Sequence, residues 1–371
     1  MYLSLFIKTG MAGIYIHIPF CKTRCTYCDF FSTTLLSRRD DYVRALCQEA
    51  DQRLANIAAP VQTVYFGGGT PSLLSTAHIQ RIISRLPIAA DTEEITLEAN
   101  PGDLTATYLR DLRRIGINRL SIGIQSFDDE VLRFIGRRHT AAEAVQAVRT
   151  AQNEGFDNIS IDLIYGIPSH NSDPLLSLQQ QIDTALSLDI QHISTYCLTY
   201  EEGTPITRLI ENGTIEEVDE DTENAMYDLI SSRLTAAGFE HYEVSNFALP
   251  GHRSRHNGNY WNRTPYIGLG AGAHSYDGNS IRSWHPDNLD QYINNPVFLH
   301  QERLTPTDIY NERIMLGLRT AEGILLRELH NPQKALSYIG QGLLQLTDNQ
   351  RIVATLSGSH ILNRIIEDLM D

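Results

Sequence analysis

The chain has 371 residues, of which 45 are acidic and 30 basic, so its net charge of −15 argues against broad nucleic-acid binding and against docking on anionic lipid. Its hydrophobic fraction of 42% is ordinary for a globular protein, and its length predicts one large domain and a smaller one. No apolar run reaches the roughly 18 residues of a transmembrane helix. The apolar start, Met1 to Ile7, is followed by Lys8 instead of preceded by a basic residue, which argues against a signal peptide and favours a cytoplasmic protein; Met11 is an alternative start.

Short apolar runs alternate with longer amphipathic runs over the first two-thirds of the chain. Strands are expected at Gly13–Ile18, Thr63–Phe66, Glu94–Glu98, Arg119–Ile124, Asn158–Ile164 and His192–Leu198. Helices are expected between them, at Asp40–Leu54, Ala77–Leu86, Leu104–Ile115, Asp128–Ile135, Ala141–Glu154 and Leu175–Leu188. This alternation predicts an α/β fold of parallel strands joined by crossover helices. An open six-unit barrel and a doubly wound sheet both fit the pattern.

The regular alternation fades after Glu201. The expected elements beyond it are helices at Ala225–Ala237, Glu312–Arg319, Tyr338–Leu346 and Leu362–Met370 and strands at Phe239–Val244 and Arg351–Thr355, with a loop-rich stretch at 247–283. The predicted organisation is an N-terminal extension (1–12), a barrel domain (13–245), a loop-rich region (246–300) and a mainly helical C-terminal domain (301–371). A winged-helix form is one option for that last domain.

Three of the five cysteines fall within eight positions, where Cys21, Cys25 and Cys28 have the spacing C-x3-C-x2-C. They follow the first expected strand directly, and ligands gather at the carboxyl ends of strands in α/β folds. Thiolates suit iron–sulfur clusters or zinc, and three of them leave one iron of a [4Fe–4S] cluster open. A zinc site with a distant fourth ligand and three buried cysteines are the alternatives. Cys47 and Cys197 are expected to pack in the core.

A glycine-rich loop, Gly67 to Thr70 followed by Pro71, comes after the second expected strand. Glycines there let a ligand approach the backbone closely, although a tight turn has the same composition.

The segment from Tyr15 to Cys21 (Y-I-H-I-P-F-C), together with the cysteine spacing, resembles the opening of the oxygen-independent coproporphyrinogen III oxidase group of radical S-adenosylmethionine (SAM) proteins. The resemblance implies a partial (β/α)6 radical SAM barrel in which SAM binds the open iron of the [4Fe–4S] cluster. An electron donor then allows the cluster to cleave SAM to methionine and a 5′-deoxyadenosyl radical. The cofactor carries that chemistry, and the protein positions it.

Further positions that line the SAM site in this group match here at successive strand ends. They are Tyr15, Gly68, Gly69, Thr70, Glu98, Gln125, Arg137 and Asp162. Carboxylates accept hydrogen bonds from ribose hydroxyls or an ammonium group, and arginine pairs with a carboxylate. Each of these residues alone is as well explained by a capping or surface role, but the ordered set favours the SAM site.

Two departures separate the chain from the authentic dehydrogenases of this group. Those enzymes carry a further cysteine two positions after the triad, where this chain has Phe30, and a longer N-terminal segment, where only 20 residues precede Cys21. A third feature resembles the H-N-x-x-Y-W motif of the HemW-type heme chaperones, a sister branch of the group. Its residues here are His256, Asn257, Tyr260 and Trp261.

The motif implies contact with heme, because imidazole is a usual axial ligand of heme iron and aromatic rings stack on a porphyrin face. His256 is the first candidate for the iron ligand, with His252 and His274 as competitors. Arg253 and Arg255 are candidates for pairing with the heme propionates. A loop whose aromatic residues cover the open side of the barrel is the alternative. His17, in the strand that leads to the cysteines, is expected to support the cluster indirectly.

The sequence thus favours a heme chaperone that carries a SAM-bound [4Fe–4S] cluster and passes heme to an apo-hemoprotein, for which a respiratory protein is one option. A homodimer is also an option. The alternatives are an oxygen-independent coproporphyrinogen III dehydrogenase and another radical SAM enzyme with a different substrate.

Overall fold

The computed structural model of the chain describes residues 13–55, 61–89, 92–168 and 173–371, so the expected N-terminal extension at 1–12 lies outside the described residues. Within these ranges, six parallel strands form the centre of the fold and pair with one another in chain order. They are β1 (Gly13–Ile18), β2 (Thr63–Gly68), β3 (Glu94–Ala99), β4 (Arg119–Gln125), β5 (Ile159–Tyr165) and β6 (His192–Cys197). Because a doubly wound sheet reverses its strand order at a switch point, this sequential order selects the partial (β/α)6 barrel.

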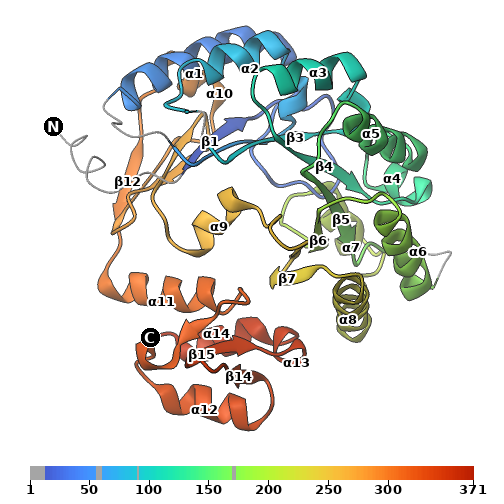
Figure 1. The fold of residues 1–371 in the computed structure, drawn as a ribbon, viewed down its shortest axis with the longest axis vertical. Coiled ribbons are helices and arrows are strands. Elements are labelled where there is room, and N and C mark those ends of the chain that lie inside the picture. The colour runs from blue at the N-terminus through green and yellow to red at the C-terminus, as the bar shows by residue number, and fades with distance from the viewer. Residues whose placement is uncertain (1–12, 56–60, 90–91, 169–172) are drawn as a thin grey trace.

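Helices cover the outer, convex face of this sheet (Figure 1). Alternate strand residues such as Ile14 and Ile16 are fully buried in the core beneath them, whereas the residues between, such as Tyr15, face the concave side. The connecting helices are α1 (Arg39–Arg53), α2 (Thr76–Ile83), α3 (Ala106–Arg114), α4 (Asp129–Phe134), α5 (Ala141–Asn153) and α6 (Pro174–Leu186). Thr140 shows why they begin where they do, because it forms a capping box with Glu143 at the start of α5.

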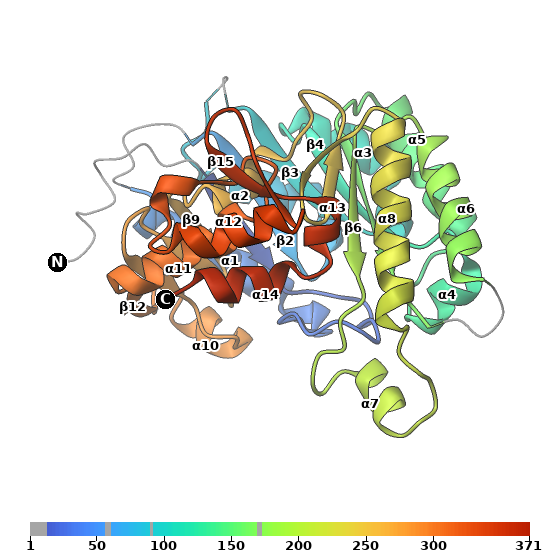
Figure 2. The same ribbon diagram turned by 90° about the horizontal axis from the view of Figure 1, so that it is seen from below.

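Two more helices follow β6. The short helix α7 (Pro205–Glu211) projects away from the sheet, whereas the long helix α8 (Glu220–Ala236) lies beside α6 (Figure 2). Acidic residues fill the first turn of α8, where the helix dipole stabilises negative charge, and Asp219 caps the helix.

The stretch expected to be loops at 247–283 instead extends the sheet, which corrects the sequence-based prediction. Strand β9 (Tyr266–Leu269) pairs in parallel with β1, and β10 (His274–Tyr276), β11 (Ile281–Trp284) and β12 (His300–Arg303) add to it antiparallel. On the other edge lie β8 (Asn246–Ala248) and β7 (Glu240–Glu243), so the described sheet has twelve strands. Strands of three or four residues are too short to show the period-2 pattern, which is why the stretch was interpreted as loops. The segment also carries α9 (Arg255–Trp261) and α10 (Leu289–Asn294).

The C-terminal domain packs helices on a small antiparallel sheet, as a winged-helix form requires. Its helices are α11 (Pro306–Gly317), α12 (Pro332–Gly340), α13 (Leu356–Ser359) and α14 (Leu362–Leu369). Its strands β13 (Ile324–Leu325), β14 (Leu344–Leu346) and β15 (Arg351–Ala354) pair in the order β13-β15-β14. The helix expected at Tyr338–Leu346 was wrong in its second half, because Gly342 adopts φ +75° and the chain then enters β14.

Main-chain hydrogen bonds join this domain to the barrel. The amide of Val244 donates to the carbonyl of Arg319 at 2.9 Å, and the amide of Ala321 donates to Tyr242 at 2.9 Å. The segment after α11 thereby extends the β7 edge of the sheet. No helix within the described ranges is both long and apolar enough to cross a membrane.

Candidate functional site

The cysteine loop leaves the carboxyl end of β1. Cys21 is almost fully buried, and its amide donates to the Thr33 carbonyl at 2.9 Å, which fixes the loop against the segment that follows it. Two polar side chains reach the sulfurs. The Thr70 hydroxyl donates to Cys21 Sγ at 3.6 Å, and Arg137 Nη1 donates to Cys25 Sγ at 3.6 Å. Donors of this kind stabilise thiolates, the form that binds iron.

The three thiols interact electrostatically. Burial raises the pKa of Cys21, and the neighbouring Cys25 adds to the rise. Burial likewise raises the pKa of Cys28, with further contributions from Cys25 and Cys21. In the part of the chain that the structure describes, no group of three Cys, His, Asp or Glu side chains is already arranged to hold a single metal ion.

The glycine-rich loop follows β2 and leaves no room for larger residues. A Cβ on Gly67 would lie 2.9 Å from the rings of both Tyr15 and Tyr65, and Gly68 adopts φ +108°, a conformation that favours glycine. A Cβ on Gly69 would lie 2.9 Å from the Phe20 carbonyl oxygen beside the cysteine loop. The loop therefore packs closely against β1 and the beginning of the cysteine loop, and only glycine fits at these positions.

Two carboxylates face the concave side, Glu98 in β3 next to this loop and Asp162 in β5. Glu98 accepts hydrogen bonds from the Tyr65 hydroxyl at 2.8 Å and the Gly68 amide at 3.1 Å, and Asp162 accepts one from the Ser121 hydroxyl at 3.2 Å. Burial raises the pKa of Glu98 to about 7 and also raises the pKa of Asp162. A cationic ligand placed beside them would favour their ionised forms.

Arg137 connects the cysteine loop with the end of β4. It donates to the Gly123 carbonyl as well as to Cys25, while its buried Nε has no hydrogen-bond partner within the described residues. Gln125 ends β4 with φ +71°, at a register irregularity between β4 and β5. A guanidinium nitrogen without a partner, held beside the cysteine loop, is a donor suited to a ligand carboxylate.

The predicted cluster and SAM residues thus gather around the carboxyl ends of β1 to β5, but the H-N-x-x-Y-W motif lies elsewhere. Helix α9 packs at the opposite end of the barrel, where β2 and β3 begin. His256 is buried there; its Nδ1 is 2.9 Å from Thr63 Oγ1, its Nε2 is 2.9 Å from the Tyr260 hydroxyl, and its amide donates to Glu94 at 3.2 Å. Burial and the nearby Arg119 lower the pKa of His256 to about 3.

The other residues expected around heme are divided between two environments. Arg253 pairs with Glu240 and Glu322, and Arg255 pairs with Glu93, so neither guanidinium is free. Trp261, with its neighbour Asn262, lines a cleft of about 350 Å³ between α9 and the C-terminal domain.

Asn257 of the motif and the two cysteines outside the triad occupy structural positions. Asn257 lies at the start of α9, where its amide donates to the Ser254 hydroxyl at 3.4 Å. Cys47 lies in the core as expected, whereas Cys197 is only partly buried at the end of β6.

Sequence reasoning missed several residues that shape the interior. Tyr65 stacks on His256 with ring centroids 5.2 Å apart and also holds Glu98, so it links the two ends of the barrel. Arg119 is fully buried and lies within electrostatic reach of Glu98, Asp162 and His256. Each residue occupies an alternate strand position on the concave face, a signal that becomes visible once the strand register is assigned.

A partial barrel with a cysteine loop after β1 and a glycine cradle after β2 defines a radical SAM protein. In agreement, the model of the Radical SAM superfamily matches residues 15–182. The chain is 37% identical over 325 residues to the heme chaperone HemW of Bacillus subtilis (strain 168), covering 85% of each chain. It is 40% identical over 278 residues to the heme chaperone HemW of Escherichia coli (strain K12), covering 72% of this chain and 71% of that one. The chain belongs to the HemW family.

A solved structure supports the fold over the whole length. Coproporphyrinogen III oxidase (HemN) from Escherichia coli, described as a radical SAM enzyme, aligns with a TM-score of 0.82 and covers 100% of this chain and 92% of that chain. At 22% identity this likeness shows the shared fold alone. Membership of the radical SAM superfamily implies SAM and a [4Fe–4S] cluster as cofactors of this chain.

Proposed function

We propose that this protein is a heme chaperone that binds heme and transfers it to an apo-hemoprotein. The observation that carries the proposal is the 37% identity to a heme chaperone over 85% of both chains. The H-N-x-x-Y-W helix supports it, because α9 packs against the barrel that would hold SAM. A cytoplasmic location, a homodimer and a respiratory recipient belong to the same proposal.

Cys21, Cys25 and Cys28 would hold the cluster. The donor set fits, because three thiols share one loop and two of the sulfurs already accept hydrogen bonds from Thr70 and Arg137. When bound, the cluster supplies one electron that can cleave SAM, and an external donor would provide it.

The glycine cradle and the residues around it would hold SAM. Gly68, Gly69 and Thr70 line the approach, and Glu98 would accept a hydrogen bond from the ammonium or ribose of SAM. Arg137 would pair with the carboxylate of SAM through its unpaired nitrogen. Tyr15, Gln125 and Asp162 complete the set. Because both carboxylates are buried, the positive charge of bound SAM would favour their ionised forms.

The test is heme binding by the anaerobically purified protein with its cluster reconstituted. We expect hemin to bind stoichiometrically and to shift its Soret band, and the bound heme to pass to an apo-hemoprotein on mixing. Absence of a Soret shift would overturn the proposal. So would formation of protoporphyrinogen from coproporphyrinogen III, SAM and a reductant, because that product defines the dehydrogenase.

A matched pair of substitutions tests the cluster assignment. Cys25→Ala should abolish the broad visible absorbance of the reconstituted protein and its bound iron and sulfide. Cys47→Ala should leave both unchanged, because Cys47 lies on the buried face of α1, in the core. Retention of a full cluster in Cys25→Ala would show that another residue supplies the ligand.

A further inference from the structure

A row of aromatic side chains crosses the strands that extend the barrel. His274 in β10 pairs directly with Trp284 in β11, and Trp284 pairs directly with His300 in β12, so the three side chains stand on one face of the sheet. The rings of His274 and Trp284 are stacked with centroids 5.8 Å apart, and His300 lies 5.7 Å beyond. Phe298, 39% exposed, packs on His300 and ends the row.

The two imidazoles of the row differ from most other histidines of the protein. His17, His192 and His256 use both ring nitrogens in hydrogen bonds. His274 and His300 are exposed, and within the described residues their ring nitrogens have no hydrogen-bond partner. An imidazole nitrogen without a hydrogen-bond partner is available to ligate a metal.

A cavity of about 380 Å³ opens over one end of this row. It is lined by Tyr266, His274, Ser275, Arg282, Trp284 and Glu302. The ring of Tyr266 also contacts Tyr260 of the H-N-x-x-Y-W helix edge-on, with centroids 4.7 Å apart. Tyr260 of the motif therefore supports a residue that lines the cavity, whereas His256 of the motif forms its hydrogen bonds in the barrel interior.

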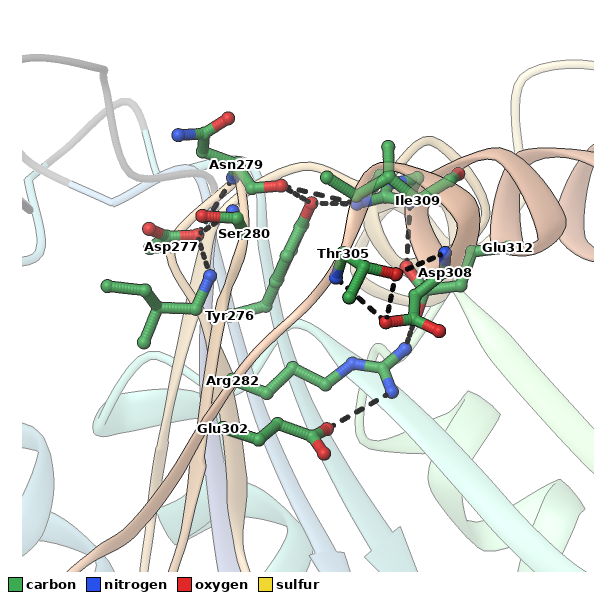
Figure 3. A network of polar contacts seen from close by, with 12 residues as sticks. Tyr276, Asp277, Asn279, Ser280, Arg282, Glu302, Thr305, Asp308, Ile309 and Glu312 are labelled. Carbon is green, nitrogen blue, oxygen red and sulfur yellow. Dashed lines mark hydrogen bonds and ion pairs between the residues drawn. The ribbon is translucent and has the colours of Figure 1, made fainter.

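Ion pairs join the strands that line the cavity to the C-terminal domain (Figure 3). Arg282 in β11 pairs with Glu302 in β12, at 3.6 Å between Nη1 and Oε1, and with Glu312 in α11. Arg263 reaches the same Glu312 carboxylate at 2.7 Å. These contacts fix β11 and β12 relative to α11, so the aromatic row is supported before any ligand arrives.

We propose that this cavity is the heme site and that His274 is the axial ligand of the heme iron, with the porphyrin lying over Trp284 toward His300. The inference rests on the proposed function. A ring nitrogen of His274 donates its lone pair to the iron and displaces any water bound there, and the aromatic row gives the macrocycle an apolar floor. His274 is preferred over His300 because it lines the cavity and lies beside Tyr266.

The experiment is a hemin titration of the holoprotein, with cluster and SAM bound, for the wild type and three variants. His274→Ala should weaken heme binding at least tenfold and remove the spectrum of a histidine-ligated heme, and added imidazole should restore that spectrum. Trp284→Ala should weaken binding while the ligand spectrum stays, because it removes only an edge-on aromatic contact with the porphyrin. His252→Ala is the matched control, since this imidazole also has no hydrogen-bond partner among the described residues but lies outside the row.

The outcomes separate the two proposals. If the wild type fails to bind hemin, the proposed chaperone function fails. If the wild type binds and His274→Ala keeps the same affinity and spectrum, or if only His252→Ala loses them, the assignment of His274 is wrong while heme binding stands. Iron, sulfide and SAM content of each variant, equal to the wild type, verify that the barrel is folded.

Discussion

Replacement of Glu49 by glutamine should detach the strand extension from the barrel. Glu49 lies in α1, is fully buried, and accepts four hydrogen bonds, three of them from residues far away in the sequence. Oε1 is 2.6 Å from Arg53 Nη1 and 2.6 Å from His285 Nε2, and Oε2 is 2.6 Å from the Tyr292 hydroxyl and 2.9 Å from the Gly270 amide. The carboxylate thus joins α1 to β9, α10 and the turn after β11.

The size of the effect follows from the burial of this group. Removing one partner of a buried ion pair costs about 3–5 kcal/mol, because the remaining charge loses its compensation. A neutral amide leaves the Arg53 guanidinium facing a second donor. Burial acts to raise the pKa of Glu49, but the His285 hydrogen bond and the Arg53 charge lower it further, to a net value below the usual one. The stabilisation is therefore present above pH 4.5 and is lost as the pH falls through the lowered pKa in the folded state.

Hydrogen exchange read residue by residue is the suitable assay. In Glu49→Gln the amides of β9 to β12 should exchange at least about a hundredfold faster at neutral pH, as a loss of 3 kcal/mol or more implies. The matched control is Asp51→Asn on the same helix, which removes an exposed pair with Arg85 at 2.8 Å and should change exchange little. If both variants exchange alike, the buried network does not hold the extension and the reasoning is refuted.

Three further predictions concern the candidate SAM and cluster site. Folding raises the pKa of Glu98 from 4.5 to about 7, so the free energy of unfolding should fall by about 3 kcal/mol as the pH rises between these values, at about 1.4 kcal/mol per pKa unit. In Glu98→Gln, the urea midpoint plotted against pH should be flatter over this range. Gly68→Ala should cost roughly 1–3 kcal/mol and abolish SAM binding in equilibrium dialysis, because φ is +108° and a Cβ would lie 2.6 Å from His17. Thr70→Val removes a donor to Cys21 Sγ, so the cluster potential should become more negative by on the order of 40 mV in a redox titration, and an unchanged potential would show that the hydroxyl does not reach the thiolate.

The barrel was predictable because its strands and helices each carry a clear local pattern. Strands of six or seven residues with both faces covered, followed by capped amphipathic helices, are visible in sequence. The extension was missed because β10 has only three residues, too few for a period-2 pattern, and β12 is exposed along its whole length and shows no buried face. In the C-terminal domain the two-residue strand β13 has the same difficulty.

The candidate SAM and cluster residues could be predicted together because the carboxyl ends of parallel strands meet at one edge. The position of His256 could not, since the local sequence does not tell at which end of a barrel a returning helix packs. The ion pairs of Arg253 and Arg255 could not be predicted either, because their partners, such as Glu322 and Glu93, are distant in the sequence. His274 was named among the competitors as heme ligand, but its alignment with Trp284 and His300 needs the register of three strands.

The parallel pairing of β9 with β1 makes the barrel and its extension a single surface. A nucleotide resting at Tyr15 and a porphyrin resting at His274 would share that surface, at a separation set by the spacing of adjacent strands. Because both ligands would rest on one sheet, this separation is fixed. Electrostatic and steric effects of one ligand would therefore act directly on the other. Gly268 of β9 lies between the two positions, because it pairs with Tyr15 and adjoins the backbone of His274.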